Sequence, residues 1–284
     1  MKYAVFLIKS NDRKGLLATI SNFFYEKDFN ILRCQQYTDL YENKYYMRVK
    51  LDIAELHITR RKLENAFKVL ADSLGLEWQV HYSDYVPRVA VMVSHTSHCM
   101  YDLLVHQHEG DLQCEIPLVI SNHSSLEHVA DKFRVPFFCC PVSKSNKSEQ
   151  EKKVIELLQK NHIDLVVLAR YMQILSDDFI QSYTGRVINI HHAFLPAFKG
   201  ADPYRRAWER GVKVIGATAH YATRDLDEGP IIEQDVEHIS HEFEPADLKR
   251  IGKDIERRVL TRAVKAHLEH RVITSGLRTI VFPV

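Results

Sequence analysis

Two polar side chains stand at the end of an apolar run in the segment "RVINIHH", residues 186–192. Asn189 and His191 are two positions apart, so on an extended strand they point to the same side. An amide and an imidazole can both donate hydrogen bonds to one oxygen, which polarises a carbonyl and stabilises an oxyanion. A lone Asn-x-His pair is more typical of ordinary hydrogen-bonded loop residues. It indicates a catalytic site only together with a further functional group.

An acidic turn follows, with its last aspartate 36 residues after His191. In "HYATRDLDEGPIIEQD", residues 220–235, Asp225, Asp227 and Glu228 crowd before a Gly-Pro pair. Like charges so close raise the pKa of the least solvated carboxyl, a useful property in a general base. The alternative is a solvated acidic turn without a chemical role. The two stretches together predict a site where carboxylate, imidazole and amide meet.

The elements around these residues have the pattern of an α/β domain. Continuous apolar runs ("RVAVMVS", "CEIPLVISN", "PFFCC", "DLVVLA" and "RVINI") alternate with helical segments such as "SEQEKKVIELLQKN". Strands that are apolar on both sides predict a Rossmann-like, mostly parallel sheet with helices on both faces. Ligands bind such sheets outside the carboxyl ends of the strands, where "RVINI" stops. A strand–turn–strand hairpin around "TRDLDEG", a long helix over residues 245–270 and a terminal strand complete this half.

The N-terminal half has a different order. "YAVFLI", the helical "LLATISNFFYEKDF", a two-strand segment over residues 30–52, the amphipathic "TRRKLENAFKVLADSLG" and "LEWQVHYS" follow one another. This βαββαβ order predicts a ferredoxin-like domain over residues 1–84. The short linker "SDYVPRVA" contains Pro87, so the second domain is assigned to residues 85–284.

Composition excludes several function classes. A formal net charge of +1 gives no indication of the basic surface with which proteins bind nucleic acid. No apolar stretch approaches the roughly 18 residues of a membrane span, and the N-terminus lacks a signal-peptide pattern. We therefore expect a cytoplasmic protein without a membrane or nucleic-acid partner. The five cysteines are interpreted as buried reduced thiols, and the closely spaced histidines His95/His98 and His106/His108 lack ligand-spaced partners, so no metal site is predicted.

The segment "NDRKGLLATIS" resembles the ACT family of amino-acid-sensing domains, which joins the first strand to the first helix through Asp-x-x-Gly-Leu-Leu-x-x-Ile. We expect Asp12 to cap the helix, Gly15 to let the backbone approach a ligand, and Leu16 to pack inward with Leu17 and Ile20. The resemblance implies a homo-oligomer with a possible amino-acid effector. Assembly without any effector stays open.

The C-terminal half resembles the folate-dependent formyltransferase family, through "NIHHAFLPAFKGADPYRRAWERG" and "GATAHYATRDLDEGPIIEQD". The resemblance implies the formyltransferase fold and a catalytic triad of Asn189, His191 and Asp227. It also implies that "LARYMQIL" holds the pterin ring mainly through backbone groups, although Gln173 stands where the family commonly has arginine. The substrate-binding residues that it implies are Arg170, Tyr171, Met172, Gln173, Leu175, His192, Phe194, Ala222, Thr223 and Asp225.

One branch of this family joins an ACT domain to the formyl-handling domain and hydrolyses 10-formyltetrahydrofolate to formate and tetrahydrofolate. The resemblance to that branch implies an enzyme whose substrate is the folate itself and which needs no cofactor. We expect Asp227 to activate water, directly or by relay, while protonated His191 and Asn189 stabilise the oxyanion. His192 either tunes His191 or fills the pocket.

Two other functions stay open. The first is a formyltransferase with an amine acceptor, glycinamide ribonucleotide or methionyl-tRNA. The phosphate of the former needs a glycine-rich loop after the first strand, but "VSHTSHCMYDLL" has no glycine and carries His95, His98 and Met100. The second is a folate sensor without catalysis, which the presence of all three triad residues disfavours.

Overall fold

The chain forms two compact units in a computed structural model that describes residues 2–55, 58–196 and 203–284. The first unit runs to Val86 and includes His270–Ile273 and Ile280–Val284. The second comprises Pro87–Glu269 and Thr274–Thr279. The sequence boundary at residue 84 lies close to the first break between units. No local sequence pattern predicts that these C-terminal residues belong to the first unit.

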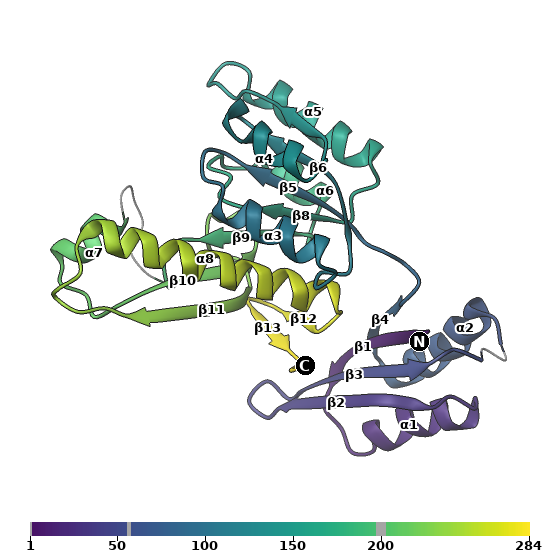
Figure 1. The fold of residues 1–284 in the computed structure, drawn as a ribbon. Coiled ribbons are helices and arrows are strands. Elements are labelled where there is room, and N and C mark those ends of the chain that lie inside the picture. The colour runs from purple at the N-terminus through teal and green to yellow at the C-terminus, as the bar shows by residue number, and fades with distance from the viewer. Residues whose placement is uncertain (1, 56–57, 197–202) are drawn as a thin grey trace. The chain divides into compact units, whose positions relative to one another are not determined.

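The first unit has the predicted βαββαβ order, with its sheet in the order β2-β3-β1-β4 and all of its strand pairs antiparallel (Figure 1). Its elements are β1 (Tyr3–Asn11), α1 (Leu16–Glu26), β2 (Ile31–Asp39), β3 (Lys44–Asp52), α2 (Arg60–Leu74) and β4 (Glu77–Tyr82). The ferredoxin-like arrangement is consistent with the predicted ACT-like domain.

The start of α1 differs from the prediction that Asp12 caps it. The residue before the helix is Gly15, in the left-handed region at φ 88°, and no side chain caps the helix. The backbone N–H of Asp12 instead donates to Asn43 O. Leu16 and Ile20 pack inward as expected, but Leu17 is 40% exposed because it lies on the outer side of the first turn. Helix α2 is bounded by a Thr59 cap and by Gly75 in the left-handed region.

The core of the first unit is aromatic. The rings of Phe6, Phe24, Phe67 and Trp78 pack with centroids 4.8–6.0 Å apart. The opposite side of β1 is buried too, since Ile273 and Phe282 pack against the partners Val5, Leu7 and Tyr46. This second contact explains why "YAVFLI" is apolar at every position instead of alternating.

The second unit is built on a seven-stranded sheet in the order β11-β10-β9-β8-β5-β6-β7. Strands β9, β8, β5, β6 and β7 are parallel, and β10 and β11 are antiparallel additions at one edge. The elements are β5 (Arg88–Val93), α3 (His98–His108), β6 (Glu115–Ser121), η1 (Ser124–Leu126), α4 (Glu127–Lys132), β7 (Phe137–Cys139), α5 (Lys147–Lys160), β8 (Leu165–Leu168), α6 (Asp177–Ser182), β9 (Val187–His191), α7 (Pro203–Glu209), β10 (Val214–Tyr221), β11 (Ile231–His238) and α8 (Pro245–Leu268). The hairpin β12 (Val272–Ser275) and β13 (Arg278–Val281) ends the chain.

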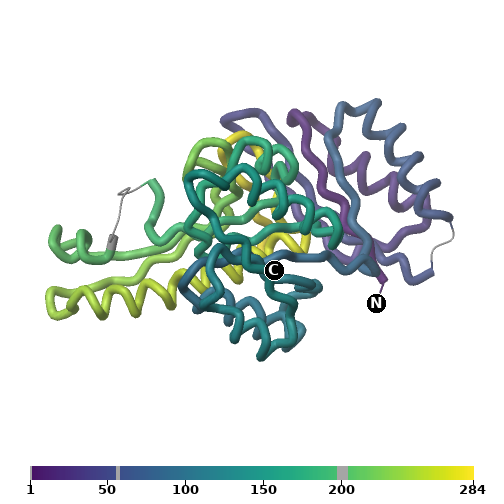
Figure 2. The backbone as a smooth tube through the Cα atoms, turned by 90° about the horizontal axis from the view of Figure 1, so that it is seen from above, coloured from purple at the N-terminus to yellow at the C-terminus, as the bar shows by residue number. Residues whose placement is uncertain are grey.

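Helices cover both faces of this sheet, as the apolar strands predicted. On one face, α5 and α6 pack through Val154, Leu158 and Phe179 onto alternate strand residues such as Met92 and Val166. Helices α3 and α8 contact each other on the other face, and α8 also contacts β9, β10 and β11. Figures 1 and 2 both show α8 running alongside the β10–β11 hairpin.

Two further expectations concern membrane-spanning helices and the burial of the cysteines. None of the helices between residues 2–55, 58–196 and 203–284 combines the length and apolarity that a membrane crossing needs. All five cysteines are free, but only Cys99, Cys114 and Cys140 are buried, and Cys34 and Cys139 are exposed. The interpretation of all five as buried thiols was therefore wrong for two of them.

We predict that Phe67→Ala destabilises the first unit by about 3–5 kcal/mol, because it opens a cavity in the aromatic core. Urea unfolding followed by Trp78 fluorescence measures the change, since the Phe67 ring lies 4.9 Å from the indole. Val69→Ala on the same helix is the control, because Val69 is exposed and is expected to change stability by no more than about 0.5 kcal/mol. Equal effects of the two substitutions would contradict the assignment of this core.

Candidate active site

Strand β9 supplies Asn189 and His191, which point to the same face of the sheet. The antiparallel register sets His220 of β10 directly opposite Asn189 and Thr218 opposite His191. Directly paired residues lie on one face of a sheet, so His220 joins the predicted pair. His191 and His220 are buried, at 8% and 1% exposure, and Asn189 is half-buried.

The loop between β10 and β11 brings Asp227 to these side chains. Asp227 Oδ2 lies 3.2 Å from His191 Nδ1, and its Oδ1 lies 3.5 Å from both Asn189 Nδ2 and His220 Nε2. The turn depends on Gly229, since a Cβ there would overlap the carbonyl oxygen of Tyr221. Asp227 itself has φ 59°, a conformation that is uncommon outside glycine and occurs at functional sites. The structure thus places the predicted triad together.

The pKa of Asp227 differs in direction from the prediction. The hydrogen bond from His191, and next that from His220, hold the pKa of this carboxyl well below its ordinary value and outweigh the effect of burial. Asp225 and Glu228 are exposed on the same turn, so they do not crowd the buried carboxyl. The expectation of a raised pKa for Asp227 was wrong, because the hydrogen bonds from His191 and His220 lower this pKa and the acidic neighbours on the turn point into solvent.

The two histidines have different hydrogen-bonding roles. His191 uses Nδ1 toward Asp227, and its Nε2 is buried without a partner among the described residues. His220 Nδ1 donates to the Tyr221 carbonyl at 3.0 Å. Its Nε2 therefore accepts from Asn189 at 3.2 Å when the ring is neutral and donates to Asp227 when the ring is protonated. The unpaired His191 Nε2 is the group that remains for a ligand.

A cavity of about 290 Å³ opens over this cluster. It is lined by Asn189, His191, His220 and Asp227 on one side and by residues 170–175 on the other. Met172, Ile174 and Leu226 line it although their side chains are 60%, 59% and 54% exposed. Exposed apolar side chains around a polar centre are typical of a site for a flat, partly apolar ligand.

Most of the predicted substrate-binding residues line this cavity. They are Arg170, Tyr171, Met172, Gln173, Leu175, His192, Ala222 and Thr223. Phe194 and Asp225 are not among the lining residues. The Cβ of Phe194 lies beside Gly216 of β10, and Asp225 is exposed with its carbonyl accepting from Thr223 Oγ1. Residues 197–202 of the predicted loop after His191 lie outside the described residues.

Several lining residues were missed from the sequence, among them His220, Ile180, Arg224 and Leu226. A histidine inside the apolar run "GATAHYA" was the available signal for His220. The others enter the cavity through a helix and a turn whose positions depend on tertiary packing.

The residues predicted for an effector lie together at the start of α1. Gly15 is exposed, and a Cβ there would meet nothing within 4 Å. Leu16 is buried in the core of its unit, so its side chain is not available to a ligand. Of the three predicted effector residues, Gly15 through its backbone and the half-buried Asp12 are the ones that remain accessible.

The fold and site define the second unit as a formyl transferase unit, and a family model described as "Formyl transferase" matches residues 87–264. A protein named formyltetrahydrofolate deformylase from Synechocystis is 49% identical over 98% of both chains. A crystal structure of a formyltetrahydrofolate deformylase from Pseudomonas syringae matches with a TM-score of 0.97 and 39% identity, covering 100% of this chain and 95% of that one.

A glycinamide ribonucleotide transformylase from Symbiobacterium toebii is more distant, with a TM-score of 0.66 and 29% identity over 72% of this chain and 97% of its own. The chain therefore matches the deformylases over nearly its full length, but matches the transformylase over only 72% of its length. The chain belongs to the formyl transferase family and, within it, to the family of formyltetrahydrofolate deformylases.

We predict that Gly229→Ala destabilises the second unit by more than about 3 kcal/mol, because the new Cβ would collide with backbone that cannot move away. Gly185→Ala is the matched control. Gly185 has φ 68° but open space around it, so the cost is that of the left-handed conformation, about 1–2 kcal/mol. Thermal unfolding followed by circular dichroism compares the two variants. Similar melting points would show that the turn does not need glycine.

Proposed function

We propose that this chain hydrolyses 10-formyltetrahydrofolate to formate and tetrahydrofolate. The observation that carries the proposal is the buried, unpaired Nε2 of His191 beside Asn189 and Asp227 in a cavity with an apolar rim. The relatives that match over their whole length are named for this reaction. The reaction needs no cofactor, because water is the nucleophile and the folate is the substrate.

The formyl oxygen is proposed to bind between His191 and Asn189. When His191 carries a proton on each nitrogen, Nδ1–H donates to Asp227 and Nε2–H is left to donate to the oxygen. That oxygen becomes negative when water attacks the formyl carbon, so the hydrogen bond strengthens in the transition state. The second N–H of Asn189 is a further donor from the same face of β9.

Asp227 is proposed to position the attacking water and to stabilise the imidazolium of His191. Its lowered pKa keeps the carboxyl ionised at neutral pH, which makes it a weak base but a strong hydrogen-bond acceptor. The water oxygen forms the new bond to carbon, its proton passes by way of the Asp227–His191 pair to the folate nitrogen, and the C–N bond breaks. This favours a relay over direct, complete proton transfer to the aspartate.

The flat heterocycle of the folate is proposed to lie on Met172, Ile174 and Leu226. Burying these exposed apolar side chains supplies binding energy, and backbone groups of residues 170–175 supply hydrogen bonds. The backbone N–H of Met172 already donates to Ser94 Oγ, which fixes this segment before the ligand arrives.

The loop after β5 supports hydrolysis over transfer to a phosphorylated amine. Its side chains make internal contacts: Ser94 donates to Asn122, the His95 ring stacks on His123 at 3.7 Å, and His98 contacts Glu256. No glycine lets the backbone crowd an anion in this loop. A phosphate-bearing acceptor therefore lacks a prepared site there, whereas water needs none.

We predict that the protein releases formate and tetrahydrofolate from 10-formyltetrahydrofolate in buffer without any amine. Asp227→Asn is expected to reduce turnover by about 10²–10⁴ with little change in folate binding, because the carboxylate acts on the transition state. Glu228→Gln in the same turn is the control and is expected to keep wild-type turnover, since its carboxylate is exposed. Formate formation at the wild-type rate in Asp227→Asn would overturn the catalytic assignment.

The first unit is proposed to assemble the protein as a homo-oligomer and to bind an amino acid at Asp12 and Gly15, with glycine or methionine as candidates. The support is the open left-handed Gly15 at the start of α1. The expected cytoplasmic location stays a prediction.

We predict that glycine or methionine raises the melting temperature of the full-length wild-type protein and not of a Gly15→Val variant. Differential scanning calorimetry measures the shift, because a ligand that binds the folded state raises its stability. Size-exclusion chromatography of both proteins checks that assembly is unchanged. The absence of any shift in the wild type would leave assembly as the role of this unit.

A further inference from the structure

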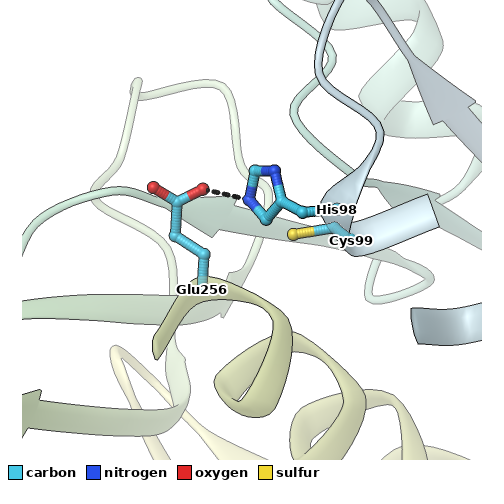
Figure 3. A group of neighbouring side chains, drawn as sticks. All are labelled: His98, Cys99 and Glu256. Atoms are coloured by element: carbon cyan, nitrogen blue, oxygen red, sulfur yellow. Dashed lines mark hydrogen bonds and ion pairs between the residues drawn. The ribbon is translucent and has the colours of Figure 1, made fainter. Parts of the chain in front are cut away.

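A buried carboxylate, Glu256 of α8, lies outside the triad and is 1% exposed. Its Oε2 accepts from His98 Nε2 at 2.7 Å, and its Oε1 accepts from the hydroxyl of Tyr204 at 2.5 Å. Arg170 Nε lies 3.4 Å from Oε2. Figure 3 shows Glu256 reaching from α8 toward His98 and Cys99 at the start of α3. Four segments far apart in sequence thus meet at one carboxylate.

His98, Cys99 and Glu256 lie close enough together to be compared with a metal site, but their contacts are those of a hydrogen-bonded network. One ligand atom each from His98, Cys99 and Glu256 lies within 4.8 Å of the others. Both Glu256 oxygens already accept hydrogen bonds, and the guanidinium of Arg170 supplies the compensating positive charge. A divalent cation would be repelled by that guanidinium. Burial alone raises the pKa of Glu256, but the His98 hydrogen bond and the Arg170 charge outweigh it, and the net shift is downward.

Helix α8 is shaped for the Tyr204 contact. Gly252, one turn before Glu256, is buried in the middle of the helix, where glycine costs about 1 kcal/mol relative to alanine. A Cβ at this position would overlap the ring and hydroxyl of Tyr204. The glycine therefore makes room for Tyr204 to reach the Glu256 carboxylate. Helix stability alone would favour alanine at this position.

Arg170 connects this network to the proposed active site. Its Nη1 lies 2.6 Å from His192 Nδ1, and both residues line the cavity. Arginine has only donors, so His192 Nδ1 accepts and a neutral ring carries its proton on Nε2. The backbone of Arg170 is held at φ 66°, a strained conformation that the contacts of the guanidinium help to fix.

His192 is surrounded by groups that decide its charge. Burial, the Arg170 charge and His191 lower the pKa of His192 to about 4, while Glu256 and Asp227 act in the opposite direction. The ring of His191 stacks on it at 4.8 Å, and the Tyr204 ring lies 6.5 Å away. The lowered pKa means that the ring is neutral at pH 7 and would become charged only as the pH falls toward 4.

We propose that Glu256 is a positioning residue that acts through Arg170 to hold His192 as the neutral Nε2–H tautomer against His191. This inference rests on the proposed hydrolysis, in which His191 must carry positive charge when the oxyanion forms. Two stacked imidazoles cannot both be charged without repulsion. Keeping His192 neutral therefore reserves the proton for His191, and the Nε2–H of His192 remains a donor in the cavity.

The first test needs no turnover. Histidine-ring nitrogen NMR of the full-length protein is expected to show His192 neutral, protonated on Nε2, between pH 5 and 8. In Glu256→Gln the guanidinium loses its anchor, so the buried ring is expected to stay neutral but to carry its proton partly on Nδ1. A wild-type His192 protonated on Nδ1, or one that titrates near pH 6.5, would overturn the proposal even if the enzyme is fully active.

The second test separates positioning from folding. Glu256→Gln is expected to lower kcat about tenfold or more with KM within about threefold, because the His192 ring no longer presents a single tautomer to His191. Gly252→Ala and Tyr204→Phe are expected to lower kcat as well, because both disturb the contact of Tyr204 with Glu256. Thr261→Val is the matched control, because it removes another α8–α3 contact, the 2.6 Å bond to Asp102, without touching Arg170. It is expected to keep the wild-type kcat and the wild-type His192 tautomer.

The outcomes are distinguishable. A Glu256→Gln variant with the wild-type kcat and the wild-type His192 tautomer would overturn the positioning role. A loss of kcat that is equal in Thr261→Val would do the same, because it would trace the effect to helix docking. Should the wild type release no formate, the proposed hydrolysis fails, and the His192 tautomer still decides whether Glu256 controls this ring.

Discussion

The hydrogen bond between His191 and Asp227 is the contact on which the candidate site depends. It joins the end of a parallel strand to a loop that leaves an antiparallel one, at 3.2 Å. The antiparallel addition of β10 next to β9 makes this possible, because it sets His220 opposite Asn189 and lets the following loop return over both. A parallel strand in the place of β10 would send that loop elsewhere.

The site stores conformational strain where its chemistry is proposed to occur. Arg170 and Asp227 both have positive φ without being glycine, and such residues cost of order 1–3 kcal/mol each. Each is held by interactions on both sides. Asp227 is fixed by two histidines and by the tight approach at Gly229, and Arg170 by its contacts with His192 and Glu256. The surrounding sheet and α8 make this strain tolerable.

Electrostatics divide the two adjacent histidines into different roles. His191 faces a carboxylate, whereas His192 faces a guanidinium. An anion stabilises the charged form of an imidazole and a cation disfavours it. Two neighbouring histidines thus have partners of opposite charge. The proposed oxyanion stabilisation needs this difference, since only one of two stacked rings can carry the charge.

The sequence by itself determined the alternation of strands and helices and the turn between β10 and β11, because periodicity and short motifs are local, and the family resemblance singled out Asn189, His191 and Asp227. Tertiary structure alone decided the downward shift of the Asp227 pKa, the contribution of His220 and the contacts of Glu256. The carboxyl group of Glu256 lies 2.7 Å from a histidine 158 positions away. Such contacts depend on how a helix docks on a sheet, and no local pattern encodes that distance.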